Sequence, residues 1–306
     1  MIKHVFTIGC DPEFFLRAKK TGKLISAIPF VDGTKDCPKQ LPKGGNIQRD
    51  NVAVEIATDP ANSGDMFVAC IQNTLSEAVK TLPLDTEMVI LPSANFDEKE
   101  LLHPEAQRFG CDPDYCAWEV RMNEPPFLDD VTFRSTGAHI HVGTTGEDEN
   151  AFLLDFQGKL DTVRLMDCFH GIISTVLDST KESINRRKLY GRPGAHRPKD
   201  YGVEYRVLSP YWLKSPITVM LMYHLTADVL KIVREGLAYS IISTLGEEEV
   251  KSTIMNGDVK TALKMVGTVL MEHMSEDSIH YYYEAIAKLE DLSLDFNKEW
   301  ELYKEV

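Results

Sequence analysis

The chain changes its hydrophobic periodicity near its middle, and this change limits the folds that it can adopt. The first half contains short apolar segments with a period of two, separated by Gly, Pro and Asp. These segments predict strands at about 5–8, 13–17, 24–30, 52–57, 87–91 and 138–142. The second half has helical periodicity at about 149–179, 215–245, 247–272 and 276–303, with a further strand at about 203–208. Because turns rather than helices join most strands, we expect an α+β fold in which helices pack on a mainly antiparallel sheet.

No internal repeat or low-complexity linker divides the sequence. We therefore expect a single domain over residues 1–306, with a helical C-terminal portion at about 215–306. One helix is expected inside the strand-rich half, at 64–81, because apolar residues recur there at every fourth position. Asn62 or Ser63 can cap its N-terminus.

The composition excludes several classes of protein. Of the 306 residues, 43% are hydrophobic and 26% are charged, so a disordered or fibrous chain is not expected. The net charge of −14 disfavours a nucleic-acid partner, since it repels phosphate backbones. We see neither a signal-peptide pattern nor a long uninterrupted apolar run, and expect a cytoplasmic protein without a membrane partner. The six cysteines form no CxxC pair, which favours reduced thiols over a zinc or disulfide framework.

Residues 186–206 form a basic segment in this acidic chain, with seven Lys or Arg residues against two acidic ones. A local excess of positive charge is what an anionic ligand requires. We expect a solvent-facing loop that binds anions, and an ordinary solvated loop is the alternative interpretation.

Two acidic motifs lie on predicted strands of the first half. Asp11 and Glu13 are two residues apart and would project from the same face, where carboxylate oxygens suit a hard divalent cation. Pro12 favours a strand edge or a strand start at this point. Asn51 and Glu55 are four apart on another strand and would also share a face. Exposed carboxylates on half-buried strands are the alternative.

Two further motifs combine imidazoles, a carboxylate and a guanidinium. His139 and His141 alternate with apolar residues, so both imidazoles point one way and could bind a metal or a phosphate. Glu204 and Arg206 share a strand face and could serve a metal beside a phosphate; an ion pair within that face is the alternative.

The order of these motifs resembles that of the glutamine synthetase superfamily. An acidic pair, a further glutamate, an H-x-[HN] strand, an arginine loop and an E-x-R strand line an open antiparallel sheet in that superfamily. More closely, GCDPEFF, GAHIHVG and YGRPGAHRPKDYGVEYRVLSPYW resemble type 2 carboxylate-amine ligases, which are found mainly in bacteriophage genomes. The resemblance covers roughly residues 5–215 and implies a glutamine synthetase-like catalytic fold.

The resemblance also implies a reaction. The protein is expected to be an ATP-dependent ligase that uses Mg²⁺ or Mn²⁺ and joins a carboxylate to an amine through an acyl phosphate. Its substrates would be small molecules or peptides. The implied metal ligands are Glu13, Glu55, His139, Glu204 and, less strongly, Asp11.

Arginines of the basic segment are expected to bind the nucleotide and the transferred phosphoryl group. These are Arg192, Arg197 and Arg206, and the implied catalytic residues are Arg206, Arg197 and His141, with His141 close to a substrate or phosphate. The sequence departs from the superfamily pattern in having Asp followed by Pro at the first acidic position. It also has one recognisable glutamate where glutamine synthetase has two.

Other functions remain open from the sequence. A phosphotransferase on the same scaffold, like the guanidino kinases, would release a phosphorylated product. A metal-dependent hydrolase could use His139 and His141, and a binding module would have no activity. The ligase hypothesis requires Glu13, Glu55 and Glu204 to converge with His139 on one face of the sheet.

Overall fold

Strand β1 (Thr7–Ala18) lies at the centre of a large sheet in the computed structural model, which describes residues 6–108, 113–125 and 130–302. Every named strand pairing in this sheet is antiparallel. The main path runs in the order β3-β4-β5-β1-β11-β13-β12-β8-β9, and β2 and β6 also pair with β1. A separate two-stranded sheet joins β7 (Ser93–Asn95) to β10 (Phe133–Ser135). The remaining strands of the large sheet are β2 (Leu24–Ile25), β3 (Lys39–Gln40), β4 (Asn46–Asp50), β5 (Ala53–Ala57), β6 (Thr86–Val89), β8 (Tyr115–Cys116), β9 (Arg121–Met122), β11 (Ala138–Gly143), β12 (Ala195–Lys199) and β13 (Gly202–Tyr205).

The two faces of the central strands have opposite character because side chains alternate along a strand. On β1, Ile8, Cys10 and Phe14 are buried in the core, whereas Asp11 and Glu13 point to the other face. Pro12 lies inside β1 and not at an edge. The pairing of β1 with β5 begins at Glu13, just beyond the proline that has no N–H to donate.

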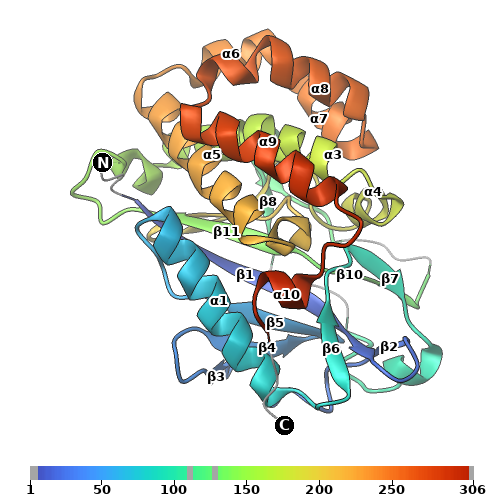
Figure 1. The fold of residues 1–306 in the computed structure, drawn as a ribbon. Helices are drawn as coiled ribbons and strands as arrows, with labels where there is room; N and C mark the ends of the chain where they lie inside the picture. The colour runs from blue at the N-terminus through green and yellow to red at the C-terminus, as the bar shows by residue number, and fades with distance from the viewer. Residues whose placement is uncertain (1–5, 109–112, 126–129, 303–306) are drawn as a thin grey trace.

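Helices cover the apolar face (Figure 1). Helix α1 packs on α5 and α5 packs on α9, and the Phe67 and Trp212 rings stack with centroids 6.1 Å apart. Helix α5 has the length and mean hydropathy of a membrane span, but its segment is mostly buried inside the protein, as expected of a core helix. The helices are α1 (Gly64–Thr81), α2 (Phe156–Met166), η3 (Asp167–Gly171), α3 (Ile172–Leu177), α4 (Lys181–Arg187), α5 (Pro216–Arg234), α6 (Ala238–Leu245), α7 (Glu247–Asn256), α8 (Val259–Thr268), α9 (Glu276–Glu290) and α10 (Phe296–Glu299), with short 3₁₀ turns at Glu98–Leu101, Ala151–Leu154, Pro210–Leu213 and Leu270–His273.

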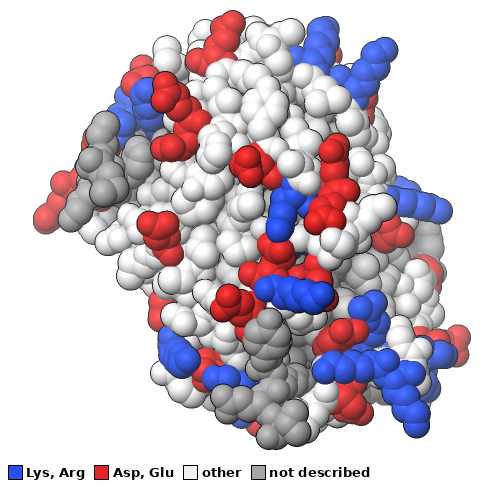
Figure 2. All heavy atoms as spheres, in the orientation of Figure 1, with Lys and Arg blue, Asp and Glu red and all other residues white. Residues whose placement is uncertain are grey.

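The surface formed by α1, α5, α9 and α10 carries acidic and basic side chains interspersed, without an extended region of one sign (Figure 2). Its charge distribution therefore gives no sign of a docking site for a large polyanion. The polar face of the sheet points away from this helical layer. It is formed by the strand residues that alternate with those buried against the helices.

The predicted α+β class and antiparallel sheet are confirmed, as is the helix at 64–81, where the Ser63 side chain accepts a hydrogen bond from the Met66 backbone N–H. Several predicted boundaries are wrong. The strands predicted at 5–8 and 13–17 are parts of β1, and the segment 24–30 has only the two-residue β2. The helix predicted at 215–245 breaks where Gly236 takes a φ of 71°. The segment 149–179 is interrupted by the π-helical turn η3.

Candidate functional site

A row of polar side chains crosses the middle of the sheet. In the strand registers, His141 on β11 lies opposite Glu204 on β13, and Glu204 lies opposite Arg197 on β12. Two positions along β11, Asp11 on β1 lies opposite His139. Strand pairing alone thus brings together residues that are up to 193 positions apart in sequence.

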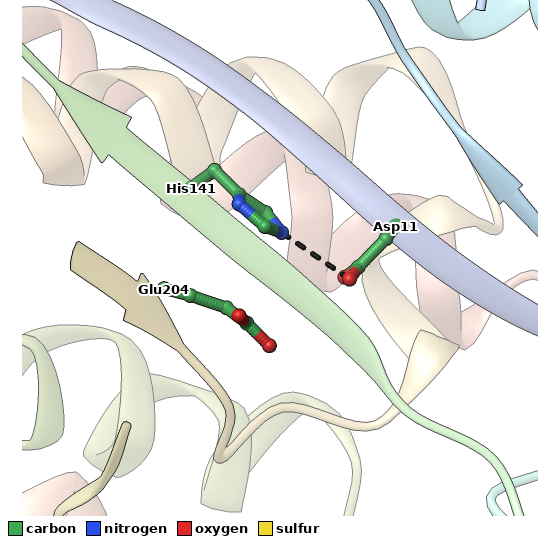
Figure 3. Close-up of side chains that lie close together, drawn as sticks. All are labelled: Asp11, His141 and Glu204. Carbon is green, nitrogen blue, oxygen red and sulfur yellow. Dashed lines mark ion pairs between the residues drawn. The ribbon is translucent and has the colours of Figure 1, made fainter. Parts of the chain in front are cut away.

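Asp11, His141 and Glu204 form the first potential metal group, with candidate ligand atoms within 4.8 Å of one another. They come from three adjacent strands and project to the same side (Figure 3). His141 Nε2 lies 3.2 Å from Asp11 Oδ2. His139 also contacts this group, since its Nδ1 is 3.0 Å from Asp11 Oδ1 and 3.8 Å from Glu204 Oε1. Two carboxylates and two imidazoles therefore surround one small volume.

The electrostatics of the first group favour ionised carboxylates. Burial alone would raise the pKa of Asp11, but His139 and His141 hold that pKa well below its ordinary value. Burial would likewise raise the pKa of Glu204, but His139 and Arg206 lower it to about 2. Burial and the Arg206 guanidinium lower the pKa of His139. Ionised oxygens and a neutral imidazole are the forms that bind a cation.

Two atoms of this group fit a bound cation for a further reason. Asp11 Oδ1 and His141 Nε2 are both buried, and neither makes a hydrogen bond within the described part of the chain. Buried polar atoms are normally satisfied, and a bound ion is one explanation for such an exception. The donor set therefore fits a divalent metal.

Glu13, Asp50 and Glu55 form a second potential metal group, again with candidate ligand atoms within 4.8 Å of one another. Glu13 and Glu55 are cross-strand neighbours on β1 and β5, and Asp50 ends the adjacent strand β4. The Gly137 N–H donates to Glu13 Oε2 over 2.7 Å, and Gln48 Nε2 donates to Glu55 Oε2 over 2.8 Å. These bonds orient the carboxylates toward each other.

Both glutamates of the second group resist ionisation. Burial and the Asp50 carboxylate raise the pKa of Glu13 to about 8. Burial and the neighbouring Asp11 and Glu13 carboxylates raise the pKa of Glu55 well above its ordinary value. Neighbouring carboxylates destabilise one another when ionised, and the Arg186 and Arg206 guanidinia offset this only partly at Glu13. A divalent cation bound by oxygen ligands would remove the repulsion.

Cationic side chains gather around Glu204 at the other end of the row. Lys199 Nζ lies 2.8 Å from Glu204 Oε2 and Arg197 Nη1 lies 3.2 Å from Glu204 Oε1. Arg206 also donates to Glu204 Oε1, and its Nε lies 3.4 Å from Asp114 Oδ2. The site thus changes from acidic near β5 to basic near β12.

The basic segment differs from the predicted solvent-facing loop. Its residues 195–199 form β12 in the sheet, and the Arg197 side chain is only 16% exposed. Arg186 and Arg187 end α4 and are buried. Arg192 is exposed instead, and the structure places it against the Lys188 carbonyl oxygen, not against Glu204 or its basic partners. The prediction was wrong because the alternation of β12 is hidden by Pro198 and by the high local charge.

A pocket beside the second group contains another buried cation. Glu13, Asp50, His139, Arg186 and Arg206 are among its lining residues. Arg186 donates to the carbonyl oxygens of residues 136, 206 and 207, and within the described ranges it forms no ion pair with a carboxylate. Burial lowers its pKa only to about 10, so it stays charged. A buried guanidinium whose hydrogen bonds go to carbonyl oxygens, with Glu13 as its main electrostatic partner, suits an anionic ligand in this pocket.

Asp50 and Arg186 were not predicted as site residues from the sequence. Lys199 was predicted only as one of the positive charges of the basic segment. Asn51 was predicted to share a strand face with Glu55. Asn51 in fact occupies the β4–β5 turn with a φ of 53°, and its amide donates to the carbonyl oxygens of residues 105, 106 and 108. The sequence signal for Asp50 was its position directly before Asn51, at the end of the strand that precedes Glu55.

Solved structures with a related arrangement were found at low sequence identity. A bifunctional glutathione synthetase from Pasteurella multocida is 10% identical with a TM-score of 0.45, and the match covers 97% of this chain and 50% of that chain. A glutamate–cysteine ligase from Francisella tularensis, solved in complex with AMP, is 10% identical with a TM-score of 0.49, covering 95% of this chain and 83% of that chain. The present chain spans about half of the length of the Pasteurella protein. No curated protein gave a significant match.

A family model gives the decisive comparison. The model described as phage phiEco32-like COOH.NH2 ligase-type 2 matches residues 131–303, which is more than half of the chain. The matched region includes His139, His141, Arg197, Glu204 and Arg206. The suspected family is therefore correct, and the chain belongs to the phage phiEco32-like COOH–NH2 ligase-type 2 family of carboxylate–amine ligases.

Proposed function

We propose that the protein uses ATP and Mg²⁺ to join a carboxylate to an amine through an acyl phosphate. The observation that supports this most is the arrangement of opposite charges on one continuous face. Glu13, Asp50 and Glu55 lie at one end of the row, and Arg197 and Lys199 lie at the other. A reaction between two anions requires cations on both sides of the transferred phosphoryl group.

The two acidic groups would hold the metal ions. The second group offers only carboxylate oxygens, which suits Mg²⁺, and the first adds imidazole nitrogen from His141 or His139. When bound, Mg²⁺ would neutralise negative charge on the nucleotide and on the acid, which lowers the repulsion between them. Asp50 supplies an acidic side chain in the region where the sequence comparison had only Glu55.

The cationic end would bind and align the nucleotide. Arg197, Lys199 and Arg206 surround the Glu204 carboxylate from β12 and from the end of β13, where they could contact phosphate oxygens. Arg192, at the exposed edge, would contact the nucleotide from outside. These residues would orient the nucleotide and stabilise the negative charge of its phosphates. Neither role requires a proton from a guanidinium.

Arg186 would anchor the acid substrate in the neighbouring pocket, close to Glu13. In the first step an oxygen of the substrate carboxylate attacks the γ-phosphorus of ATP, and the bond to the ADP oxygen breaks. In the second step the amine attacks the acyl carbon and phosphate leaves with the electron pair of the C–O bond. The amine loses one proton, so the products are amide, ADP and phosphate.

ADP formation tests this proposal directly. The purified protein is incubated with ATP, Mg²⁺ and pooled amino acids as acids and amines, and ADP release should require both partners and stop with excess EDTA. Hydroxylamine in place of the amine should trap the acyl phosphate as a hydroxamate. Acid labelled with ¹⁸O in its carboxylate should transfer one labelled oxygen to the released phosphate.

Other results would identify a different activity. ADP release with a stable phosphorylated acid or amine, and no amide, would indicate a phosphotransferase. Cleavage of a substrate without ATP would indicate a metal-dependent hydrolase. Neither ADP nor hydroxamate across a broad panel of acids and amines would contradict the ligase proposal.

A further inference from the structure

We propose that Tyr201 is a positioning residue for His141: its phenolic oxygen accepts the Nδ1–H, which leaves Nε2 as the nitrogen that binds a cation beside Asp11 and Glu204. This inference rests on the proposed metal-dependent function. It assigns a role to a side chain that belongs to neither of the two metal groups.

The contacts of the His141 ring carry the proposal. The Tyr201 hydroxyl lies 2.5 Å from His141 Nδ1, and the two rings are 6.2 Å apart between centroids. On the opposite edge of the imidazole, Nε2 is buried, lies 3.2 Å from Asp11 Oδ2 and makes no hydrogen bond within the described residues. Each nitrogen therefore has a different environment: Nδ1 contacts the Tyr201 hydroxyl and Nε2 contacts the Asp11 carboxylate.

The different partners of the two His141 nitrogens can determine which nitrogen carries the proton. A neutral imidazole carries one N–H and one lone pair, and the partner of one nitrogen selects which form is present. Histidines that bind metals almost always donate their other N–H to a second residue, which fixes the ring and its tautomer. A phenol can accept that bond through an oxygen lone pair. Burial, Glu204 and Asp11 all raise the pKa of Tyr201, so the phenol stays neutral.

The backbone holds Tyr201 in place. Tyr201 is in the two-residue turn that joins β12 to β13, because Lys199 pairs with Gly202. The Thr144 N–H donates to the Tyr201 carbonyl oxygen over 2.9 Å, and the Lys159 ammonium donates to the Lys199 carbonyl oxygen over 2.8 Å. The turn is thus tied to the end of β11 and to α2.

A small residue makes room for the ring. A Cβ atom at Gly143 on β11 would lie 2.7 Å from Thr7 Oγ1 on β1 and 3.2 Å from Tyr201 Cδ2, so glycine is required by both neighbours. Glycine here allows the tyrosine to lie against the strand that carries His141. A partly exposed aromatic side chain that served only to cover the surface would not need its hydroxyl on the imidazole nitrogen.

Mn²⁺ binding to the Tyr201→Phe variant tests the proposal. The variant keeps the ring and removes only the oxygen. Its Mn²⁺ affinity, measured by calorimetry, should fall by about 10- to 100-fold, the usual effect of removing such a partner. Pulsed EPR of bound Mn²⁺ should show a ¹⁴N coupling in the parent that is weakened in Tyr201→Phe. The His141→Ala variant identifies the part of that coupling that comes from His141.

Nitrogen NMR of the metal-free protein gives a second, independent measurement. The measurement is made at a pH high enough to keep the imidazole neutral, because burial lowers the pKa of His141 but Asp11 and Glu204 together more than offset this and raise it. In the parent, His141 Nδ1 should then carry a proton, and in Tyr201→Phe the population with a protonated Nδ1 and a free Nε2 should fall. Tyr239→Phe is the matched control, because Tyr239 is 83% exposed on α6. It should leave affinity, EPR and NMR signals unchanged.

The outcomes separate this inference from the proposed function. Parental Mn²⁺ affinity and an unchanged ¹⁴N coupling in Tyr201→Phe would overturn the role of Tyr201 even if the protein ligates substrates. Loss of the coupling in Tyr201→Phe would support it even if no ligation is found. A parent protein that binds no Mn²⁺ would overturn both the inference and the metal dependence.

Discussion

Glu13 on β1 and Glu55 on β5 lie directly opposite each other across an antiparallel strand pair, with Asp50 beside them. Directly opposed like charges destabilise a sheet. Burial first, and then neighbouring carboxylates, raise the pKa of both glutamates, with Asp50 acting on Glu13, and Asp11 and Glu13 acting on Glu55. The fold therefore maintains a locally unfavourable arrangement that a cation would stabilise, which is typical of a functional site.

Glu55→Gln should separate metal binding from folding. Without metal, the variant should be at least as stable as the parent, because a neutral amide replaces a buried carboxylate in a repulsive group. With Mg²⁺, the parent should gain about 2.7 kcal/mol at a metal concentration 100 times its Kd. The variant should lose most of this gain, which thermal unfolding with and without Mg²⁺ would measure.

Glu284→Gln provides the control for this comparison, because Glu284 is exposed on α9. Its melting temperature should respond to Mg²⁺ as that of the parent does. An equal response to Mg²⁺ in Glu55→Gln would show that Glu55 is not a ligand.

Local alternation explains what the sequence could reveal. The period of two places Asp11 with Glu13 and His139 with His141 on one face of their strands, and that face is the polar face of the sheet. The order of the strands in the sheet, in contrast, cannot be derived from alternation. It was the resemblance to a known family that linked these motifs into one site.

The residues that were missed depend on tertiary structure. Asp50 contributes to the second group because of the register of β4 with β5 and of β5 with β1, which brings Asp50 close to Glu55 and to Glu13. Arg186 reaches the pocket because α4 ends beside residues 136 and 207. A charged residue in a basic segment usually reaches solvent, so the pattern gave no reason to place Arg186 in the interior.

Arg197→Gln should lower kcat strongly, since Arg197 is part of the cationic end next to Glu204. Removing one preorganised donor to a transition state costs about 10²- to 10³-fold in comparable sites. Charge reversal to Glu is less informative than Arg197→Gln, because it would place a carboxylate against Glu204 and disturb folding as well. Initial rates of ADP formation at saturating substrates would measure the effect.

Arg192→Gln is the matched variant on the exposed edge. It should raise KM for ATP and leave kcat close to that of the parent, because Arg192 lies away from Glu204 and its partners. Equal losses of kcat in Arg192→Gln and Arg197→Gln would contradict the division between an outer contact and a catalytic one.

Gly191→Ala should damage the pocket that contains Arg186. Gly191 has a φ of 75°, and an added Cβ would overlap Arg186 Nη1 and lie 2.6 Å from the Val207 carbonyl oxygen. Gly236 has a similar φ of 71° with no atom within 4 Å of an added Cβ. Gly236→Ala should therefore cost only about 1–2 kcal/mol for the left-handed backbone.

Comparison of the two glycine variants isolates the effect on Arg186. Gly191→Ala should be less stable than Gly236→Ala by urea unfolding, and its KM for the acid substrate should rise while that of Gly236→Ala stays constant. Similar values for both variants would show that Arg186 can move aside and that the pocket does not depend on its position.

Asp167, which is buried in η3, should make the stability of the protein depend on pH. Its carboxylate accepts hydrogen bonds from Trp118 Nε1 over 2.6 Å and from the Tyr205 hydroxyl over 2.7 Å. Burial nevertheless raises its pKa to about 7. The folded state then binds a proton that the unfolded state releases near pH 4, so this contribution to stability is greatest at low pH and is lost as pH rises toward 7.

Asp167→Asn should remove this dependence. The variant cannot accept both hydrogen bonds, so it should be less stable than the parent at about pH 5.5, and the difference should shrink as the parent loses its protonated carboxyl. Each unit of pKa shift corresponds to about 1.4 kcal/mol, which is large enough to follow by urea unfolding. Measurements in EDTA from about pH 5.5 to about pH 8 avoid metal effects, and Asp155→Asn, at an exposed position before α2, is the control. A constant difference between parent and Asp167→Asn over this range would show that Asp167 does not change its ionisation on folding.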